Sequence, residues 1–219
     1  CFGLKAAGCD VVNLGEVTSP IVNFAIEHDP IRKSGVMVTA SHNPAAYNGF
    51  KIILDGEVIS GQQLQQLKSA LRSNDFSPEA SAPQITKGFI SQYCQHIVSD
   101  SSIDRSFKIV IDAGNSVAGP IAVDLFKRLG CAVEPLYCDV DGSFPNHEPN
   151  PSDEKNLQDL IAKVASTGSD LGFAYDGDGD RLVVISGDGA IIWPDKLMMI
   201  FARDLLAKMP GGDIVFDVK

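Results

Sequence analysis

Positive charge is scarce in this sequence, in which 18 lysines and arginines face 28 aspartates and glutamates, for a formal net charge of -10. Nucleic-acid-binding surfaces are basic, so this balance argues against a nucleic-acid partner and indicates that any contacts to phosphate are local. Long apolar runs are also absent, and no segment approaches the roughly 20 residues that a membrane-spanning helix needs. We therefore expect neither nucleic acid nor a membrane as a partner.

Cysteine is scarce too, with five residues in 219, and their positions show neither metal-binding nor redox spacing. An odd and scattered set argues against a disulfide framework and is typical of a protein in a reducing compartment. We therefore expect buried free thiols and a cytoplasmic location. The five residues are Cys1, Cys9, Cys94, Cys131 and Cys138.

Helical and extended patterns alternate along the chain, which predicts an α/β protein with mixed or mostly parallel sheets sandwiched by helices. Strands are expected at residues 35–40, 50–54, 108–111, 170–175, 182–185 and 213–219. Helices are expected at residues 1–7, 61–71, 89–98, 120–129, 156–164 and 194–206. Leu64, Leu67 and Leu71 recur at helical spacing, so the helix that contains them is expected to bury one stripe.

A segment rich in Ser, Pro, Ala and Asp, from Ser73 to Thr86, has no periodicity and predicts a domain boundary near its end. The expected domains are residues 1–86, residues 87–190, and a third that begins within residues 191–219. The sequence has no initiating Met, begins with what reads as the end of a helix and finishes on a predicted strand. We therefore expect an internal fragment of a longer protein.

Three carboxylates, Asp176, Asp178 and Asp180, are separated by single glycines, and Arg181 follows directly. Carboxylates about 4 Å apart repel by roughly 4 kcal/mol per pair at an effective dielectric of 20, so a cation is expected among them. Oxygen ligands without nearby cysteine or histidine suit Mg²⁺, Ca²⁺ or Mn²⁺ better than Zn²⁺. An EF-hand is excluded, because Arg181 and Gly187 stand where that loop needs glycine and glutamate. The alternative is a solvated, glycine-rich hairpin turn.

A second motif follows the predicted strand at 35–40 and contains Ser41, His42 and Asn43, with Lys51 a few residues later. A serine at a strand tip is exposed and tightly positioned, and backbone N–H groups and these neighbours can all bind an anion on its oxygen. Ser41 is therefore a candidate carrier of a phosphoryl group. The alternative is that its side chain only caps a turn.

Three other interpretations of the motifs are weaker. A serine hydrolase needs glycine two residues before and after its nucleophile, and Thr39 and Asn43 stand there. A nucleotide-binding loop of the Walker A type fails because Pro120 replaces the required lysine. An aspartyl phosphatase would use Asp176 as nucleophile in Asp-x-Asp-x-Thr, but Asp180 stands in place of the threonine.

Ser41 in T-A-S-H-N-P, Lys51 in Y-N-G-F-K and the D-G-D-G-D-R loop, in this order, resemble the α-D-phosphohexomutase superfamily. Residues 136–151, L-Y-C-D-V-D-G-S-F-P-N-H-E-P-N-P, are similar to its bacterial phosphomannomutase/phosphoglucomutase group. Ser116 departs from that group, which often has glycine in this structural turn. The resemblance covers essentially the whole chain and implies an enzyme of four domains, the first three of a common α/β plan, around a large cleft.

The resemblance also implies roles for single residues. Ser41 would be the phosphoserine, and a phosphate oxygen on it would join Asp176, Asp178 and Asp180 as ligands of Mg²⁺. The residues expected to surround the reacting group are His42, Asn43, Lys51 and Arg181, and the residue expected to contact the sugar phosphate is Lys219.

The implied reaction interconverts hexose 1-phosphate and hexose 6-phosphate through hexose 1,6-bisphosphate, which is both intermediate and activator. His42 and Lys51 are the candidates for the base that deprotonates the sugar hydroxyl. Mannose, glucose and glucosamine all remain open as the sugar, and no oligomeric state is indicated. Two alternatives are an aspartyl-type phosphohydrolase, with phosphate carried on Asp176, and a fragment that binds metal or ligand without turnover.

Overall fold

The structure is a computed structural model that describes residues 1–73, 86 and 88–216. The helices are α1 (Phe2–Ala6), α2 (Ser19–His28), α3 (Gly61–Ser73), α4 (Phe89–Asp100), α5 (Ala118–Arg128), the short 3₁₀ helix η1 (Glu154–Leu157), α6 (Gln158–Thr167) and α7 (Pro194–Lys208). The strands are β1 (Gly35–Val38), β2 (Phe50–Leu54), β3 (Glu57–Val58), β4 (Lys108–Asp112), β5 (Ala132–Leu136), β6 (Leu171–Tyr175), β7 (Leu182–Ser186) and β8 (Ile191–Ile192). Most of the predicted domain boundary and the predicted sugar-phosphate contact Lys219 lie outside the described residues.

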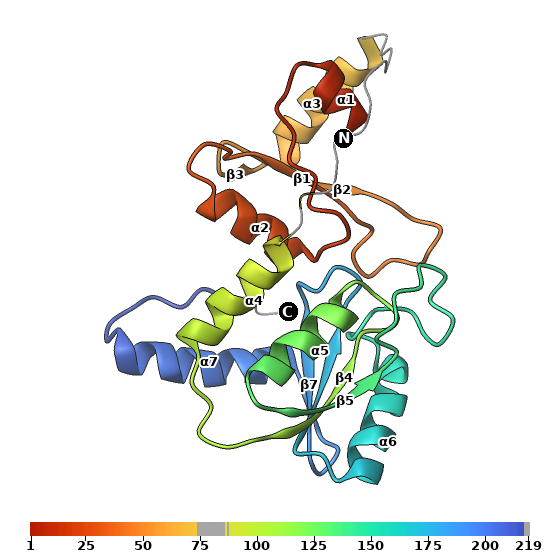
Figure 1. The fold of residues 1–219 in the computed structure, drawn as a ribbon, viewed down its shortest axis with the longest axis vertical. Helices are drawn as coiled ribbons and strands as arrows, with labels where there is room; N and C mark the ends of the chain where they lie inside the picture. The colour runs from red at the N-terminus through yellow and green to blue at the C-terminus, as the bar shows by residue number, and fades with distance from the viewer. Residues whose placement is uncertain (74–85, 87, 217–219) are drawn as a thin grey trace.

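A three-stranded antiparallel sheet in the order β1-β2-β3 organises the first part of the chain. Asp55 and Gly56 connect β2 to β3 with φ angles of 51° and 82°, as a two-residue hairpin turn requires. The longer connection from β1 to β2, residues 39–49, runs toward the second half of the molecule (Figure 1). This connection carries Ser41.

A five-stranded sheet in the order β5-β4-β6-β7-β8 organises the second part. Strands β5, β4 and β6 are parallel, whereas β7 and β8 are antiparallel to their neighbours, so the sheet is mixed. The hairpin between β6 and β7 is formed by residues 176–181. The acidic loop therefore lies at the carboxyl end of β6, where polar site residues are common in α/β sheets.

Helices cover both faces of the larger sheet. Successive side chains along each strand point to opposite faces, so apolar side chains of one strand pack against helices on both sides. Val110 packs with Leu157, Leu160 and Val164 of η1 and α6, whereas Ile109 and Ile111 of the same strand pack with Ala122 of α5 and with Cys131. A Cβ atom on Gly172 would lie 2.7 Å from a methyl group of Val164, so glycine lets α6 approach β6 closely. The predicted α/β class, with helices on both sides of a mixed sheet, is confirmed.

A third apolar cluster joins the two parts of the molecule. Val17, Ile21 and Val22, at the start of α2, are buried together with Cys94 of α4 and Ile121 of α5. Burying one such side chain contributes roughly 1.5–3 kcal/mol. The cluster therefore fixes the amino end of α2 against the second part, next to the acidic loop.

Three expectations from the sequence are wrong. Leu64 and Leu67 are 39% and 40% exposed, because the described residues of α3 lie away from both sheets (Figure 1), so these two leucines form no buried stripe; the side chain of Leu71 lies outside the described ones. Residues 213–216 form no strand, since Val215 and Phe216 remain exposed without a strand beside them in the described residues. The thiols are free, but Cys1 and Cys9 are exposed rather than buried.

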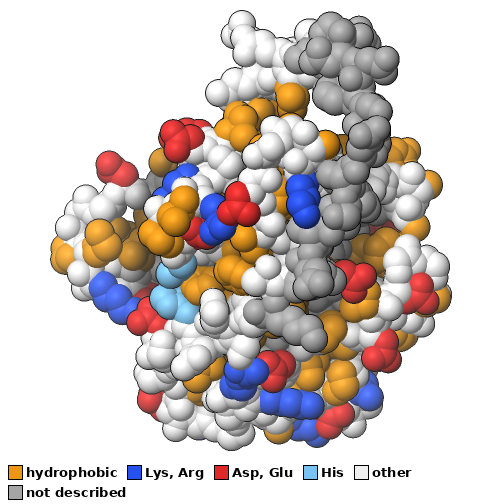
Figure 2. Space-filling model, turned by 45° about the horizontal axis from the view of Figure 1, so that its top comes forward, with side chains coloured by type: hydrophobic (Ala, Val, Ile, Leu, Met, Phe, Trp, Pro, Cys, Tyr) orange, Lys and Arg blue, Asp and Glu red, His pale blue; other side chains and the backbone are white. Residues whose placement is uncertain are grey.

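Large hydrophobic side chains remain on the described surface, and Figure 2 shows them scattered among charged ones over one face. The helix α7 forms as predicted but has no buried residue, and its exposed side chains include Met199 and Phe201. Within the described ranges, none of the helices combines the length and apolarity needed to span a bilayer.

Candidate active site between the two sheets

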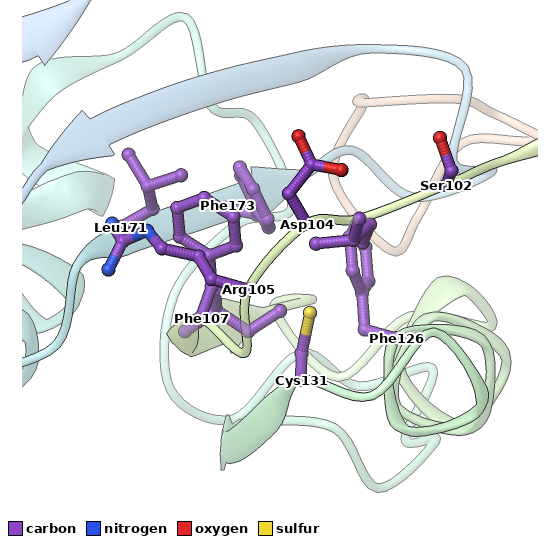
Figure 3. Close-up of a pocket in the computed structure, with 10 residues that line it drawn as sticks. Ser102, Asp104, Arg105, Phe107, Phe126, Cys131, Leu171 and Phe173 are labelled. Carbon is purple, nitrogen blue, oxygen red and sulfur yellow. The ribbon is translucent and has the colours of Figure 1, made fainter.

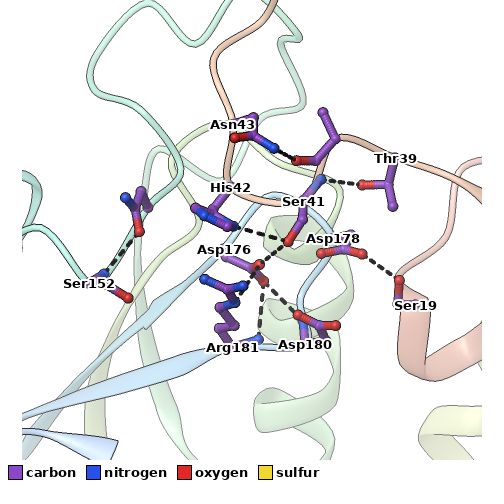
Figure 4. A network of polar contacts seen from close by, with 12 residues as sticks. Ser19, Thr39, Ser41, His42, Asn43, Ser152, Asp176, Asp178, Asp180 and Arg181 are labelled. Carbon is purple, nitrogen blue, oxygen red and sulfur yellow. Dashed lines mark hydrogen bonds and ion pairs between the residues drawn. The ribbon is translucent and has the colours of Figure 1, made fainter. Parts of the chain in front are cut away.

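The backbone of Ser41 is in the left-handed region, with φ of 55°. Few residues other than glycine adopt this conformation, which is enriched at functional sites because the surrounding structure has to enforce it. Here the Ser41 amide donates to Thr39 Oγ1 at 2.8 Å, and the Asn43 side chain donates to the Ala40 carbonyl at 2.9 Å. These bonds hold the loop so that the Ser41 hydroxyl points to the acidic loop (Figure 4).

Ser41 and Asp176 are brought together from the two parts of the molecule. Ser41 Oγ donates to Asp176 Oδ2 at 3.0 Å, and His42 Nδ1 lies 3.4 Å from the same hydroxyl oxygen. The backbones are equally close, because a Cβ atom on Gly177 would lie only 2.1 Å from the Ser41 carbonyl oxygen. Glycine at position 177 therefore allows the serine loop to dock.

The side chains of the acidic loop form a compact group of ligands. One oxygen each from Asp176, Asp178 and Asp180 lies within 4.8 Å of the others. Asp176 and Asp178 are fully buried, which contradicts the alternative of a solvated hairpin turn. Asp176 Oδ1 accepts hydrogen bonds from the backbone N–H groups of Asp180 and Arg181, at 3.0 and 3.1 Å. The loop thus holds its first carboxylate in a fixed orientation.

The two oxygens of Asp178 have different surroundings. Oδ2 accepts hydrogen bonds from Lys51 Nζ and from Ser19 Oγ, each at 2.5 Å. Lys51 Nζ also lies 2.6 Å from Asp180 Oδ2. Oδ1 of Asp178 is buried and has no hydrogen-bond partner in the described residues. A buried, unpartnered carboxylate oxygen is costly unless a ligand completes the site.

The pKa shifts at this site follow from burial and from the charged groups around each side chain. Burial, together with the charge of Asp178, raises the pKa of Asp176 above its ordinary value. Burial alone would raise the pKa of Asp178 as well, but hydrogen bonds from Lys51 and Ser19 outweigh it and lower that pKa. Burial alone would lower the pKa of Lys51, but its hydrogen bonds to Asp178 and Asp180 raise it, so Lys51 is protonated.

A hard divalent cation fits these donors. They are carboxylate oxygens, they converge, and one of them, Asp178 Oδ1, lacks any partner in the described residues. Mg²⁺ and Mn²⁺ prefer such oxygen ligands. Lys51 supplies one positive charge close to the three aspartates, and Arg181 Nε is 3.9 Å from Asp176 Oδ2, so a phosphoryl group on Ser41 would leave a marked excess of negative charge.

Sequence reasoning gave neither Ser19 nor Pro149 a place at the site. Ser19 follows Thr18 in Val-Thr-Ser-Pro, which marks the start of a helix but does not show what that helix end contacts. Pro149 contacts both Gly114 and Gly177, since Cβ atoms on these glycines would lie within 3.1 and 3.5 Å of it. His147 of the same loop lies 3.1 Å from Asp112 Oδ2 and takes no part in the acidic cluster.

A separate cavity of about 520 Å³ lies toward the amino ends of β4 and β6, away from this cluster (Figure 3). Its lining is mostly apolar and includes Phe126, Cys131 and Phe173. Arg105 lies over the ring of Phe107 at 4.1 Å and pairs with Asp170 at 3.2 Å, so its charge is already compensated. The groups able to do chemistry converge at Ser41 and the acidic loop instead.

Two family models match the chain: phosphoglucomutase/phosphomannomutase alpha/beta/alpha domain I over residues 1–78, and domain II over residues 91–189. A phosphomannomutase/phosphoglucomutase of Pseudomonas putida is 46% identical over 217 residues, which cover 99% of this chain and 46% of that protein. A phosphoglucomutase of Neisseria meningitidis serogroup B is 45% identical over 218 residues, which cover 99% of this chain and 47% of that protein.

A crystal structure of a phosphoglucomutase/phosphomannomutase family protein from Burkholderia thailandensis superposes with a TM-score of 0.89. It is 45% identical and covers 95% of this chain and 47% of its own. The chain thus spans about half the length of the relatives it matches. The matches to both domains and to these relatives extend over nearly all of its residues, so the chain belongs to the phosphoglucomutase/phosphomannomutase family of mutases.

Proposed function

We propose that this chain forms the phosphoserine and metal-binding part of a Mg²⁺-dependent phosphohexomutase, which interconverts hexose 1-phosphate and hexose 6-phosphate. The observation that carries the proposal is the hydrogen bond of 3.0 Å from Ser41 Oγ to Asp176 Oδ2, at the edge of a group of three aspartates. A hydroxyl on a strained backbone, facing a cation site, suits the carrier of a phosphoryl group. The names of the relatives support hexose phosphates as substrates.

In the proposed reaction, the bond between phosphorus and Ser41 Oγ breaks as phosphorus bonds to a hydroxyl oxygen of the sugar. The sugar hydroxyl gives its proton to a base, and Ser41 Oγ leaves with the bonding electron pair and takes up a proton to become a hydroxyl again. The resulting hexose 1,6-bisphosphate turns within the site, and Ser41 takes the phosphoryl group from the other end. Lys51 holds its own proton between two carboxylates, which favours His42 as the base.

The residues around Ser41 offset charge and orient the transferred group. Mg²⁺ bound by Asp176, Asp178 and Asp180 would supply a positive charge that stabilises the phosphoryl oxygens. Arg181 lies beside Asp176 and contributes a fixed positive charge. Asn43, from the serine loop, and Lys219 are proposed to contact the substrate. A loose, charge-dispersed transition state is stabilised by such positioned cations.

An aspartyl-type phosphohydrolase is disfavoured by the surroundings of Asp176. Asp178 and Asp180 lie beside it, and three carboxylates together are a poor position from which to attack an anionic phosphate, whereas its Oδ2 faces the Ser41 hydroxyl. The two functions differ in where the phosphate is bound. Mass spectrometry after incubation with a hexose 1,6-bisphosphate and Mg²⁺ is expected to find it on Ser41 and to find none in Ser41→Ala. Phosphate on Asp176, released by hydroxylamine, would overturn the proposal.

The isolated 219-residue chain is expected to accept phosphate and bind Mg²⁺ without mutase turnover. The chain spans about half the length of its relatives, and the activity is proposed for a protein that also contains the remaining length. Measurable turnover by these residues alone would contradict this part of the proposal. The proposed location remains the cytoplasm, as the free cysteines suggest.

A further inference from the structure

Ser19 makes two hydrogen bonds to one residue of the acidic loop. Its hydroxyl donates to Asp178 Oδ2 at 2.5 Å, and its backbone N–H donates to the Asp178 carbonyl oxygen at 2.9 Å. Ser19 is only 5% exposed, so water does not compete for these bonds. The two residues are 159 positions apart in sequence, and Ser19 comes from the part of the chain that also carries Ser41. The contact therefore ties the first residue of α2 to the middle carboxylate of the cluster (Figure 4).

The second oxygen of this carboxylate, Oδ1, has no hydrogen-bond partner in the described residues, although it is buried. We infer that Ser19 is a positioning residue for the metal: by holding Asp178 Oδ2, it presents Oδ1 as a ligand to a divalent cation. The inference rests on the metal site of the proposed function. Hydrogen bonds that orient ligating carboxylates commonly determine metal affinity as strongly as some ligands do.

Ser19 is itself rigidly placed. Val17 and Ile21 are buried on either side of it, in the cluster that joins α2 to α4 and α5. Thr18 packs on the acidic loop as well, since a Cβ atom on Gly179 would lie 2.9 Å from its methyl group. A positioning residue held by packing loses little freedom when the metal binds, which keeps the site preorganised. Metal affinity should therefore depend on how firmly α2 is docked.

The test is a calorimetric titration of Mg²⁺, repeated with Mn²⁺, into the metal-free 219-residue chain and its variants. Ser19→Ala removes the hydroxyl and is expected to weaken binding by about 10-fold to 100-fold, the range found for such supporting residues. Ser19→Thr keeps the hydroxyl. Its dissociation constant for the cation is expected to stay within about twofold of that of the original chain, well below the loss expected for Ser19→Ala. The measured metal affinity does not depend on enzyme turnover.

Ser169→Ala is the matched control. Ser169 is also a buried serine, 3% exposed, and its hydroxyl lies 2.7 Å from Thr167 Oγ1, at the opposite end of β6 from the acidic loop. Ser169→Ala should lose about as much thermal stability as Ser19→Ala and keep the metal affinity of the original chain. If both variants lost stability and affinity alike, the role of Ser19 would be merely structural and the inference would be overturned.

Unchanged Mg²⁺ affinity in folded Ser19→Ala would also overturn the inference and leave the proposed function standing. If the original chain bound neither cation, the metal site and this inference would fail together. Should circular dichroism show Ser19→Ala to be unfolded, Ser19→Cys replaces it, because a thiol keeps the shape but is a weak donor. That variant is expected to bind the metal more weakly, and an affinity equal to the original would count against the inference.

Discussion

Ser41 Oγ donates a hydrogen bond of 3.0 Å to Asp176 Oδ2, although 135 positions separate the two residues. The contact joins the loop after β1 to the loop after β6, so the site exists only where the two parts of the molecule meet. Three further contacts reinforce it: Lys51 and Ser19 reach Asp178, and the Ser41 carbonyl lies against Gly177.

Gly177→Ala should separate the two loops. The added Cβ atom would lie 2.1 Å from the Ser41 carbonyl oxygen, and backbone atoms on both sides have to move. We expect a loss of about 1–3 kcal/mol in the free energy of unfolding, as for other overpacked sites, and little phosphorylation of Ser41. Urea unfolding and mass spectrometry measure the two effects. Gly142→Ala is the control, because a Cβ atom there meets nothing within 4 Å; equal behaviour of the two variants would contradict the prediction.

Lys51→Met should make the chain more dependent on a divalent cation. It removes the ammonium group that lies 2.5 Å from Asp178 Oδ2 and 2.6 Å from Asp180 Oδ2, so carboxylate repulsion is left uncompensated. The pair is partly exposed, and we expect the metal-free chain to lose about 1–3 kcal/mol, between the limits for surface and buried pairs. Added Mg²⁺ should raise the melting temperature of Lys51→Met more than that of the original chain.

The control for this variant is Lys208→Met. Lys208 pairs with Asp204 at 2.7 Å on the exposed surface of α7, where such a pair contributes roughly 0.3–0.5 kcal/mol. Its stability and its response to Mg²⁺ should stay close to those of the original chain. A Mg²⁺ response of Lys51→Met no larger than that of Lys208→Met would show that Lys51 does not compensate the cluster.

Metal removal should destabilise the chain through the aspartates. At a Mg²⁺ concentration of about 100 times its dissociation constant, binding to the folded state adds about 2.7 kcal/mol, and EDTA should remove this gain. In Asp178→Asn, most of the difference between the melting temperature with Mg²⁺ and the melting temperature with EDTA is expected to disappear. Asp188→Asn changes an aspartate that accepts a hydrogen bond from the Ser186 hydroxyl in a remote turn, and this variant should keep the difference in melting temperature. A metal response that survives in Asp178→Asn would exclude this carboxylate as a ligand.

Stability should fall with rising pH because of His147. Its Nδ1 lies 2.8 Å from the Glu148 carbonyl oxygen and its Nε2 lies 3.1 Å from Asp112 Oδ2, so both nitrogens face acceptors and both are best protonated. Burial alone would lower the pKa of His147, but the Asp112 carboxylate outweighs it and raises the pKa above its ordinary 6.5.

For a group whose pKa is raised on folding, the stabilisation is complete below the unfolded pKa and is lost as pH rises through the folded pKa. We therefore expect the contribution of the His147–Asp112 pair to the free energy of unfolding to decline from about pH 6.5 upward. Urea titrations across this range measure the slope. Asp112→Asn removes the negative charge and should flatten it, and an identical slope in both proteins would refute the assignment.

The sequence predicted what depends on local pattern. Short apolar runs such as Ile109, Val110 and Ile111 indicated the strands, and the charge repulsion among three aspartates indicated a cation site. The features that the sequence did not predict depend on packing between distant segments. Ser19 looks like an ordinary first residue of a helix, and only the docking of α2 brings it to Asp178. Leu64 and Leu67 satisfied the helical pattern, yet both remain exposed, at 39% and 40%.

The left-handed backbone at position 41 bears on which amino acid can occupy it during evolution. Threonine also has a hydroxyl that can be phosphorylated, but its branched Cβ makes a positive φ a severe outlier, whereas serine tolerates it at a modest cost. Glycine and asparagine would suit the backbone and lack the hydroxyl. Natural variation at this position should therefore admit serine and reject threonine, even though the two alcohols are chemically alike.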